Sequence, residues 1–220
     1  MLPVMRIGVL GTGVVGETLA SKLVEVGHDV VMGARSAGND KASAWSQRFP
    51  ERAGQGTFAD AAAHGKLVVN ATAGVASLEA LRAAGAENLA GKTLLDVANP
   101  LDFSGGFPPR LSVVNDDSLG EQIQREFPAA RVVKALNTMN CQVMVDPTRV
   151  PGDHDVLMAG DDEAAKREVT GLLESFGWSS AAVHDLGGIG SARGLESYLP
   201  LWLSLMGALG TGDFNIHVAR

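Results

Sequence analysis

Three glycines near the N-terminus have the spacing of a phosphate-binding turn. They stand as Gly11-x-Gly13-x-x-Gly16 in the stretch IGVLGTGVVG. The first glycine permits a tight turn, the second lets the backbone approach a pyrophosphate, and the third lets a helix pack closely on a strand. The first turn of such a helix also offers unpaired N–H groups to an anion. The pattern therefore predicts dinucleotide binding, and a tight turn without a ligand is the alternative.

The end of the next predicted strand indicates which dinucleotide is bound. NAD-binding units carry a carboxylate about 20 residues after the glycines, where it binds the ribose hydroxyls. This chain instead has Gly33-Ala34-Arg35-Ser36. A guanidinium pairs well with a 2′-phosphate, so Arg35, assisted by Ser36, predicts NADP(H). Lys41 is a weaker candidate for the same phosphate.

Composition narrows the class of protein. The chain has 220 residues, 18 Lys plus Arg against 25 Asp plus Glu, and a net charge of −7 without a basic run. We therefore expect neither nucleic acid nor an anionic membrane as a partner. The single cysteine, Cys141, fits a reducing compartment. The apolar start, residues 1–15, resembles a signal peptide, but its glycines weaken a helix and no cleavage site follows. We expect a cytoplasmic protein.

Strand-like and helix-like segments alternate along the chain. An amphipathic helix is expected over 14–26 because apolar residues recur there at helical spacing. Strands are expected at 6–10, within 27–35, at the start of 56–65, and at 66–72, 92–100 and 131–138. This alternation predicts an α/β fold of Rossmann type, with a doubly wound, mainly parallel sheet and a small C-terminal helical cap.

The pattern of expected strands and helices changes after residue 146. We expect an NADP-binding domain over 1–146, and over 147–220 a βαβ-like extension followed by a strongly apolar helix at 191–209. That helix is too short to span a bilayer and is broken by Pro200 and Gly207. It is therefore a core helix or the contact surface of a homodimer, and a homodimer is expected.

Few other residues have the types and spacing of a catalytic or metal-binding site. Asp153-His154-Asp155 are adjacent in a strand and point to opposite faces, so no metal site is expected. The segment 191–209 contains no lysine, and Tyr198 is its one candidate proton donor. Lys134 lies in a strand and has a structural or phosphate-facing role. The Gly/Pro-rich loop 101–110 is a lid over the nicotinamide or an ordinary surface loop.

Four stretches together resemble one family, the NADPH-dependent reductases of the deazaflavin coenzyme F420. They are IGVLGTGVVG, GHDVVMGAR, VVKALNTMN and GSARGLESYLPLWLSLM, and the last carries Arg193, Glu196 and Pro200 at the family's spacing. The domain is also similar to the cytosolic part of six-transmembrane metalloreductases. The resemblance implies a Rossmann-type domain, NADP(H), and hydride exchange between nicotinamide and a deazaflavin.

The resemblance also implies positions for the cofactor. The matching residues are Thr12, Gly13, Val14 and Val15 at the pyrophosphate, Ala34 and Arg35 at the 2′-phosphate, Ala71, Thr72 and Ala73 along the cofactor, and Asn99, Pro100, Asn137, Thr138 and Met139 around the nicotinamide. Asn137 stands where archaeal members have histidine, and no residue is identified as catalytic. The acceptor therefore stays open: a deazaflavin, a flavin, a small carbonyl or imine compound, or a ferric chelate. An NADP-binding sensor without turnover is the alternative to an enzyme.

Overall fold

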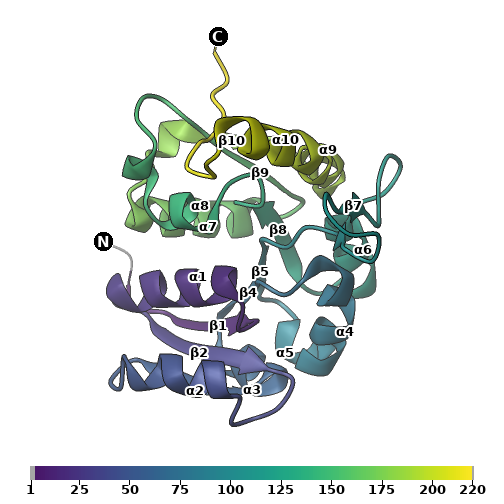
Figure 1. The fold of residues 1–220 in the computed structure, drawn as a ribbon. Coiled ribbons are helices and arrows are strands. Elements are labelled where there is room, and N and C mark those ends of the chain that lie inside the picture. Colours follow the sequence, from purple (N-terminus) through teal and green to yellow (C-terminus); the bar gives the residue numbers. More distant parts are fainter. Residues whose placement is uncertain (1–2, 220) are drawn as a thin grey trace.

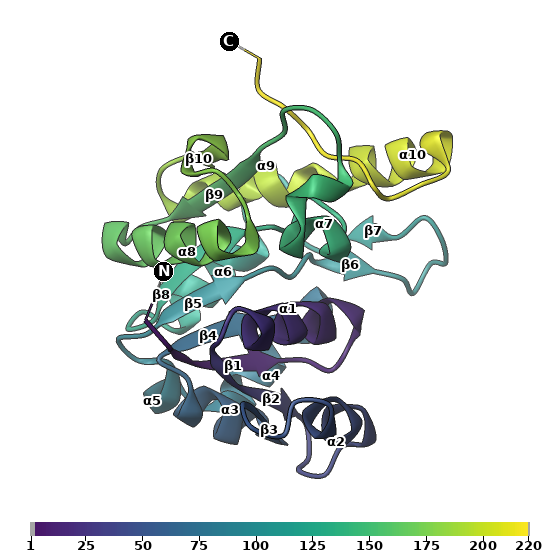
Figure 2. The same ribbon diagram turned by 90° about the vertical axis from the view of Figure 1, so that its left-hand side faces the viewer.

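The computed structural model describes residues 3–219. Met1, Leu2 and Arg220, which are the outer ends of the two predicted units, lie outside the described residues. Within them, an eight-stranded sheet runs through the molecule with helices on both faces (Figures 1 and 2). Its order is β10-β9-β8-β5-β4-β1-β2-β3. The strands are β1 (Arg6–Leu10), β2 (Asp29–Ala34), β3 (Ala53–Thr57), β4 (Leu67–Asn70), β5 (Thr93–Asp96), β8 (Arg131–Ala135), β9 (Val156–Gly160) and β10 (Val183–Asp185).

Two apolar cores lie on opposite faces of this sheet. The strands at its centre, β4 and β5, are buried throughout, as strands covered on both sides must be. One core is formed with α1 (Val14–Glu25), α2 (Asp40–Gln47), α7 (Cys141–Val145) and α8 (Glu163–Phe176). The other is formed with α3 (Phe58–His64), α4 (Gly74–Ala84), α5 (Ala86–Leu89), α6 (Leu119–Glu126) and α9 (Ala192–Ser197).

The predicted fold class is confirmed. The neighbouring strands β8, β5, β4, β1, β2 and β3 pair in parallel, in the order of a Rossmann-like sheet with β1 inside it. β9 and β10 are also parallel to each other and continue the same sheet, so residues on both sides of position 147 contribute to it. The sheet is therefore one layer across both predicted units.

One strand pair of this mainly parallel sheet is antiparallel. β9 is antiparallel to β8, with Lys134 opposite Ala159. A parallel partner would need a crossover that carries the chain back along the sheet. The segment 136–155 instead holds only the five-residue helix α7 and the 3-10 turn η1 (Pro147–Arg149), so the chain enters β9 from the opposite end.

The loop that begins at residue 101 is not irregular throughout. Its ends pair as a two-stranded antiparallel ribbon of β6 (Leu101–Asp102) and β7 (Arg110–Leu111). The ribbon projects from the carboxyl edge of the sheet beside the C-terminal helices (Figure 2). Phe103, on the ribbon, is 59% exposed. The loop therefore lies at the edge of the sheet where the parallel strands end.

The predicted core role of the apolar C-terminal segment holds for its first part, where Ala192 belongs to the second core, but not for its last helix. The segment consists of the 3-10 turn η3 (Ile189–Ser191), the helix α9 and the helix α10 (Leu199–Leu209). Another 3-10 turn, η2 (Ser180–Ala182), precedes β10. In α10 only Leu199 is buried, and Leu201 and Leu209 are each 57% exposed. No helix of the described chain is both long and apolar enough to cross a membrane.

Candidate active site

The glycine turn between β1 and α1 has three distinct backbone environments. Gly11 has φ +118°, and a Cβ there would lie 2.5 Å from the carbonyl oxygen of Ala71. A Cβ on Gly16 would lie 2.2 Å from the carbonyl oxygen of Gly11. Gly13 has ordinary φ and caps α1 without a side chain, and a Cβ added to it would have no atom within 4 Å. Gly11 and Gly16 are thus required by the fold, whereas Gly13 leaves open space in front of the helix.

A cavity of about 480 Å³ opens at this turn. Eight residues that the sequence predicts for the cofactor line it: Gly11, Thr12, Gly13, Ala34, Arg35, Ala71, Thr72 and Ala73. They come from the carboxyl ends of β1, β2 and β4, which meet at one edge of the sheet. In a doubly wound sheet this edge is where ligands bind.

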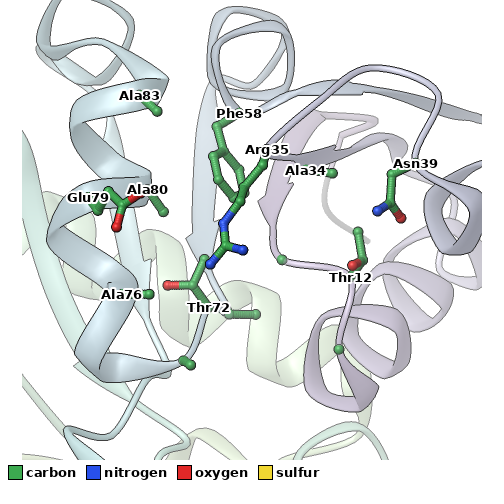
Figure 3. Close-up of a pocket in the computed structure, with 14 residues that line it drawn as sticks. Thr12, Ala34, Arg35, Asn39, Phe58, Thr72, Ala76, Glu79, Ala80 and Ala83 are labelled. Carbon is green, nitrogen blue, oxygen red and sulfur yellow. The ribbon is translucent and has the colours of Figure 1, made fainter.

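The Arg35 side chain lies inside the cavity. Figure 3 shows its guanidinium between Phe58 and Thr72. The group is exposed, and the α1 N-terminus lies on the other side of the opening. Ser36 and Lys41, the two other residues predicted at a 2′-phosphate, do not line this cavity.

Six residues of this cavity were not predicted: Asn39, Phe58, Ala76, Glu79, Ala80 and Ala83. Asn39 caps α2 by accepting hydrogen bonds from the backbone of Lys41 and Ala42. Glu79 brings a carboxylate to the far wall on α4 (Figure 3). Only the Asn39 cap position has a local sequence signal, because an asparagine before a helix is a common N-cap.

A second cavity of about 490 Å³ shares the wall made by Ala71, Thr72 and Ala73. Of the residues predicted around the nicotinamide, Asn99, Asn137 and Met139 line it, together with Val15 from the glycine turn. Three other predicted residues, Gly16, Pro100 and Thr138, are buried and line neither cavity. Val14 also lines neither cavity, and it is 71% exposed. The two cavities together form one groove along the carboxyl edge of the sheet.

The far wall of the second cavity comes from segments that are distant in the chain. The loop 101–110, for which a lid over the nicotinamide is one of two predicted roles, contributes Leu101 and Phe103, whereas no sequence pattern connects α10 to this site. Its other lining residues are Gly74, Val75, Val97, Ala98, Leu101, Phe103, Asn140, Cys141, Met144, Leu199 and Trp202. Phe103 comes from the β6–β7 ribbon, and Leu199 and Trp202 come from α10. Cys141 carries the one ionisable side chain among these residues. The cavity is therefore mostly apolar, and the described residues that line it include no carboxylic acid, lysine, histidine or tyrosine.

The two asparagines of this wall hold each other in place. Asn137 Nδ2 donates to Asn99 Oδ1 at 2.9 Å and to the carbonyl oxygen of Leu195 at 3.1 Å. Asn99 Nδ2 donates to the carbonyl oxygen of Asn137 at 2.8 Å. The loop after β5, the loop after β8 and α9 are thereby joined at the cavity.

A fully buried ion cluster lies beneath this wall. Lys134 Nζ is 2.7 Å from Asp96 Oδ2 and 2.8 Å from Glu196 Oε1, and all three side chains are at most 2% exposed. Burial acts to lower the pKa of Lys134, but the two carboxylates outweigh it and raise that pKa above its ordinary value. Lys134 is thus structural, one of its two predicted roles.

Hydrogen bonds connect this cluster to both cavities and to the C-terminal helices. Asp96 Oδ1 accepts from Asn70 Nδ2 at 2.8 Å, and Asn70 Oδ1 accepts from the Thr72 hydroxyl at 2.7 Å. Glu196 accepts the first two N–H groups of α6, at 2.8 and 3.0 Å. The cluster therefore fixes Thr72 on one side and α9 on the other.

The predicted proton donor and the ligand-type residues of 153–155 lie away from the groove. The Tyr198 hydroxyl is buried, and burial raises the pKa of Tyr198. Asp155 accepts from the backbone N–H of Val218 at 2.6 Å and from His217 Nδ1 at 3.1 Å, which ties down the C-terminal segment. Within residues 3–219, no group of His, Cys, Asp and Glu is arranged to hold a metal ion.

Comparisons with known proteins agree with this architecture. A family model described as NADP oxidoreductase, coenzyme F420-dependent, matches residues 6–100. The F420-dependent NADP reductase of Methanothermobacter marburgensis is 33% identical over 91% of this chain and 92% of its own. Metalloreductase STEAP3 of Rattus norvegicus is 32% identical over 90% of this chain, which spans only 38% of that protein.

Solved structures show the same relationship. A candidate F420-dependent NADP reductase from Arthrobacter sp. FB24 superposes with a TM-score of 0.91, is 56% identical, and covers 98% of this chain and 100% of its own. A reductive aminase from Aspergillus terreus, at 20% identity and a TM-score of 0.64 over 94% of this chain and 63% of its own, shares the fold alone. With the glycine turn, the parallel sheet and the matched length taken together, the chain belongs to the F420-dependent NADP oxidoreductase family.

Proposed function

We propose that this chain is an NADP(H)-dependent oxidoreductase that transfers a hydride between the nicotinamide and a deazaflavin-type acceptor. The observation that carries the proposal is the groove of two adjoining cavities, one beside an uncapped helix N-terminus and a guanidinium, the other apolar. The identities of the two cofactors, NADP(H) and the deazaflavin F420, come from the family to which the chain belongs. No residue is assigned a catalytic proton transfer.

The residues of the first cavity fit NADP(H). The space in front of Gly13, which a Cβ would occupy, admits a pyrophosphate, and the free N–H groups of α1 face it. Arg35 would meet the 2′-phosphate, and Thr12, Val14, Val15 and Ala34 would complete the contacts that the family implies. Ala71, Thr72 and Ala73 would guide the dinucleotide toward the second cavity.

The second cavity fits a planar acceptor ring. Nicotinamide supplies the hydride when NADP(H) is bound, so the protein has to stack two rings and exclude water. Val15, Met139, Leu199 and Trp202 provide apolar walls for such rings. Reduction of a carbonyl or imine is favoured by a proton donor beside the nicotinamide, and Cys141 is the one ionisable lining residue. The cavity therefore favours a ring acceptor over those substrates.

A panel of acceptors tests the proposed function. Purified protein is mixed with NADPH and, in separate reactions, a 5-deazaflavin, FMN, FAD, a quinone, a ferric chelate and a cyclic imine, and absorbance at the NADPH band is followed. We expect oxidation with the deazaflavin and little with the imine. No oxidation with any acceptor would instead favour an NADP-binding sensor.

Replacing Arg35 by alanine is expected to weaken NADPH binding selectively. A hydrogen bond to a charged group contributes about 1.5–3 kcal/mol, so the NADPH dissociation constant should rise about tenfold to more than a hundredfold. NADH lacks the 2′-phosphate and should bind as before. Calorimetry with both nucleotides at one salt concentration measures the ratio. Lys41→Ala is the control, and an unchanged ratio in Arg35→Ala would contradict the assignment.

The apolar face of α10 leads us to propose a homodimer. Leu201 is 57% exposed on that helix, and most of the helix is not buried by the described chain. Leu201→Glu is therefore expected to halve the mass in light scattering, because a charge buried in an apolar interface is costly. Val4→Glu, at a residue 60% exposed near the start of β1, is the control. A wild-type protein that is monomeric at all concentrations would contradict the proposal.

A further inference from the structure

One atom of the Asn137 amide is left without a partner at the second cavity. Asn137 is 2% exposed, and its Oδ1 has no hydrogen-bond partner among the described residues. The orientation of the amide is fixed because Nδ2 donates to two acceptors, Asn99 Oδ1 and the carbonyl oxygen of Leu195. A flipped amide would place its oxygen against both of them. The unpaired atom is therefore an acceptor.

A buried acceptor of this kind is expected to receive a hydrogen bond from an N–H or O–H donor. Nearly all buried polar atoms in folded proteins are hydrogen-bonded, and an unpaired one destabilises the state that contains it. Asn137 lines the second cavity, whose other walls are mostly apolar. A molecule that fills this cavity can bring such a donor to Asn137.

We propose that Asn137 Oδ1 is a specificity determinant that accepts a hydrogen bond from an amide-type N–H of the bound ligand. This inference rests on the proposed function, in which two bound molecules carry such a group. The nicotinamide has a carboxamide N–H, and the pyrimidinedione ring of a deazaflavin has an imide N–H. A quinone has only carbonyl oxygens and would leave Oδ1 unpaired.

Trp202, which lines the same cavity, carries an unpaired hydrogen-bond donor. Its Nε1 is buried without a partner among the described residues, and an indole N–H only donates. Its ring is held by Phe214, with the two ring centroids 5.4 Å apart. The cavity thus has one unused acceptor and one unused donor. Carboxamides and cyclic imides carry both an N–H and a C=O, the two kinds of group that these atoms lack.

The first arm of the test examines the nicotinamide. Calorimetry compares NADP+ with its 3-acetylpyridine analogue, in which a methyl ketone of nearly equal size replaces the carboxamide. If the carboxamide is the donor, the wild type should prefer NADP+ by about tenfold. In Asn137→Leu this preference should fall to within about twofold, because the acceptor is gone.

The second arm examines the acceptor ring. A 5-deazaflavin and its N3-methyl derivative are bound to the protein saturated with NADP+, and quenching of tryptophan fluorescence gives both dissociation constants. If the imide is the donor, a preference of about tenfold for the free N–H should again disappear in Asn137→Leu. The arm that changes identifies which molecule supplies the N–H.

Controls separate this role from a general packing defect. Asn215→Leu removes another amide whose Oδ1 is buried without a partner among the described residues, at a position that lines neither cavity, and should keep the wild-type preference. A wild type that shows no preference in either arm, or an Asn137→Leu protein that keeps it, overturns the inference. If that variant fails to fold, the wild-type comparison still decides. Absence of deazaflavin binding would reject the proposed acceptor while the nucleotide arm still tests Asn137.

Discussion

Replacing Lys134 by methionine is expected to lower the free energy of unfolding by about 3–5 kcal/mol, the usual cost of breaking a buried ion pair from one side. The substitution leaves the carboxylates of Asp96 and Glu196 without their cation, and both are at most 2% exposed. Urea unfolding followed by fluorescence and far-UV circular dichroism measures the change. A loss below about 1 kcal/mol would show that the cluster is not charged as described.

Lys166→Met provides a matched control. Lys166 is also largely buried and also contacts two carboxylates, Glu163 and Asp185, each at 2.7 Å. Those carboxylates are 69% and 41% exposed, so water solvates them when the lysine is removed. We expect a loss of about 1 kcal/mol or less.

The effect of pH on this prediction has a definite sign. The pKa of Lys134 is raised in the folded protein, so its stabilising contribution is complete below the ordinary lysine pKa of about 10.4. The contribution is lost only as pH rises through the higher folded value. The difference between wild type and Lys134→Met should therefore not shrink between pH 7 and 9 through deprotonation of this lysine.

Replacing Gly13 by valine is expected to abolish dinucleotide binding and to leave the fold intact. The new side chain meets no protein atom within 4 Å of its Cβ, so it adds no strain, but it occupies the space in front of α1 where the pyrophosphate would lie. The NADPH dissociation constant should rise by at least ~100-fold, which corresponds to about 2.8 kcal/mol. Calorimetry measures this change, and circular dichroism checks the fold.

Two other glycine variants make the comparison specific. Gly194→Val adds a side chain where there is also open space, on α9, and should leave NADPH affinity unchanged. Gly16→Val should instead unfold the protein or lower its stability, because its Cβ would lie 2.2 Å from the carbonyl oxygen of Gly11. Unchanged NADPH affinity in a folded Gly13→Val protein would mean that the motif is only a turn.

Local sequence determined the first half of the site. The turn from β1 to α1 depends on glycines within six positions of one another. The continuous apolar runs of β1 and β4 and the helical period of α1 are likewise properties of short windows. Arg35 could be assigned to the same cavity because it follows β2, and strands that are adjacent and parallel end at one edge. Order along the chain was thus enough to place these residues.

Only the tertiary structure decided the second half. The far wall of the second cavity brings together Cys141, Trp202 and Phe103, the last from a loop for which the sequence left two roles open. No periodicity relates positions so far apart. The reversal of β9 against β8 and the exposure of α10 depend on what each element packs against, which its own residues do not encode.

Lys134 shows the difference within a single residue. Its place in the strand RVVKA was evident from the sequence, but whether its ammonium faced a phosphate or a carboxylate was not. The answer depends on Asp96, 38 residues earlier, and on Glu196, 62 residues later, whose charges reach it only after the sheet and α9 have assembled. Short-range patterns set the strands and the glycine turn, whereas burial and charge pairing are set by contacts between segments that the chain brings together on folding.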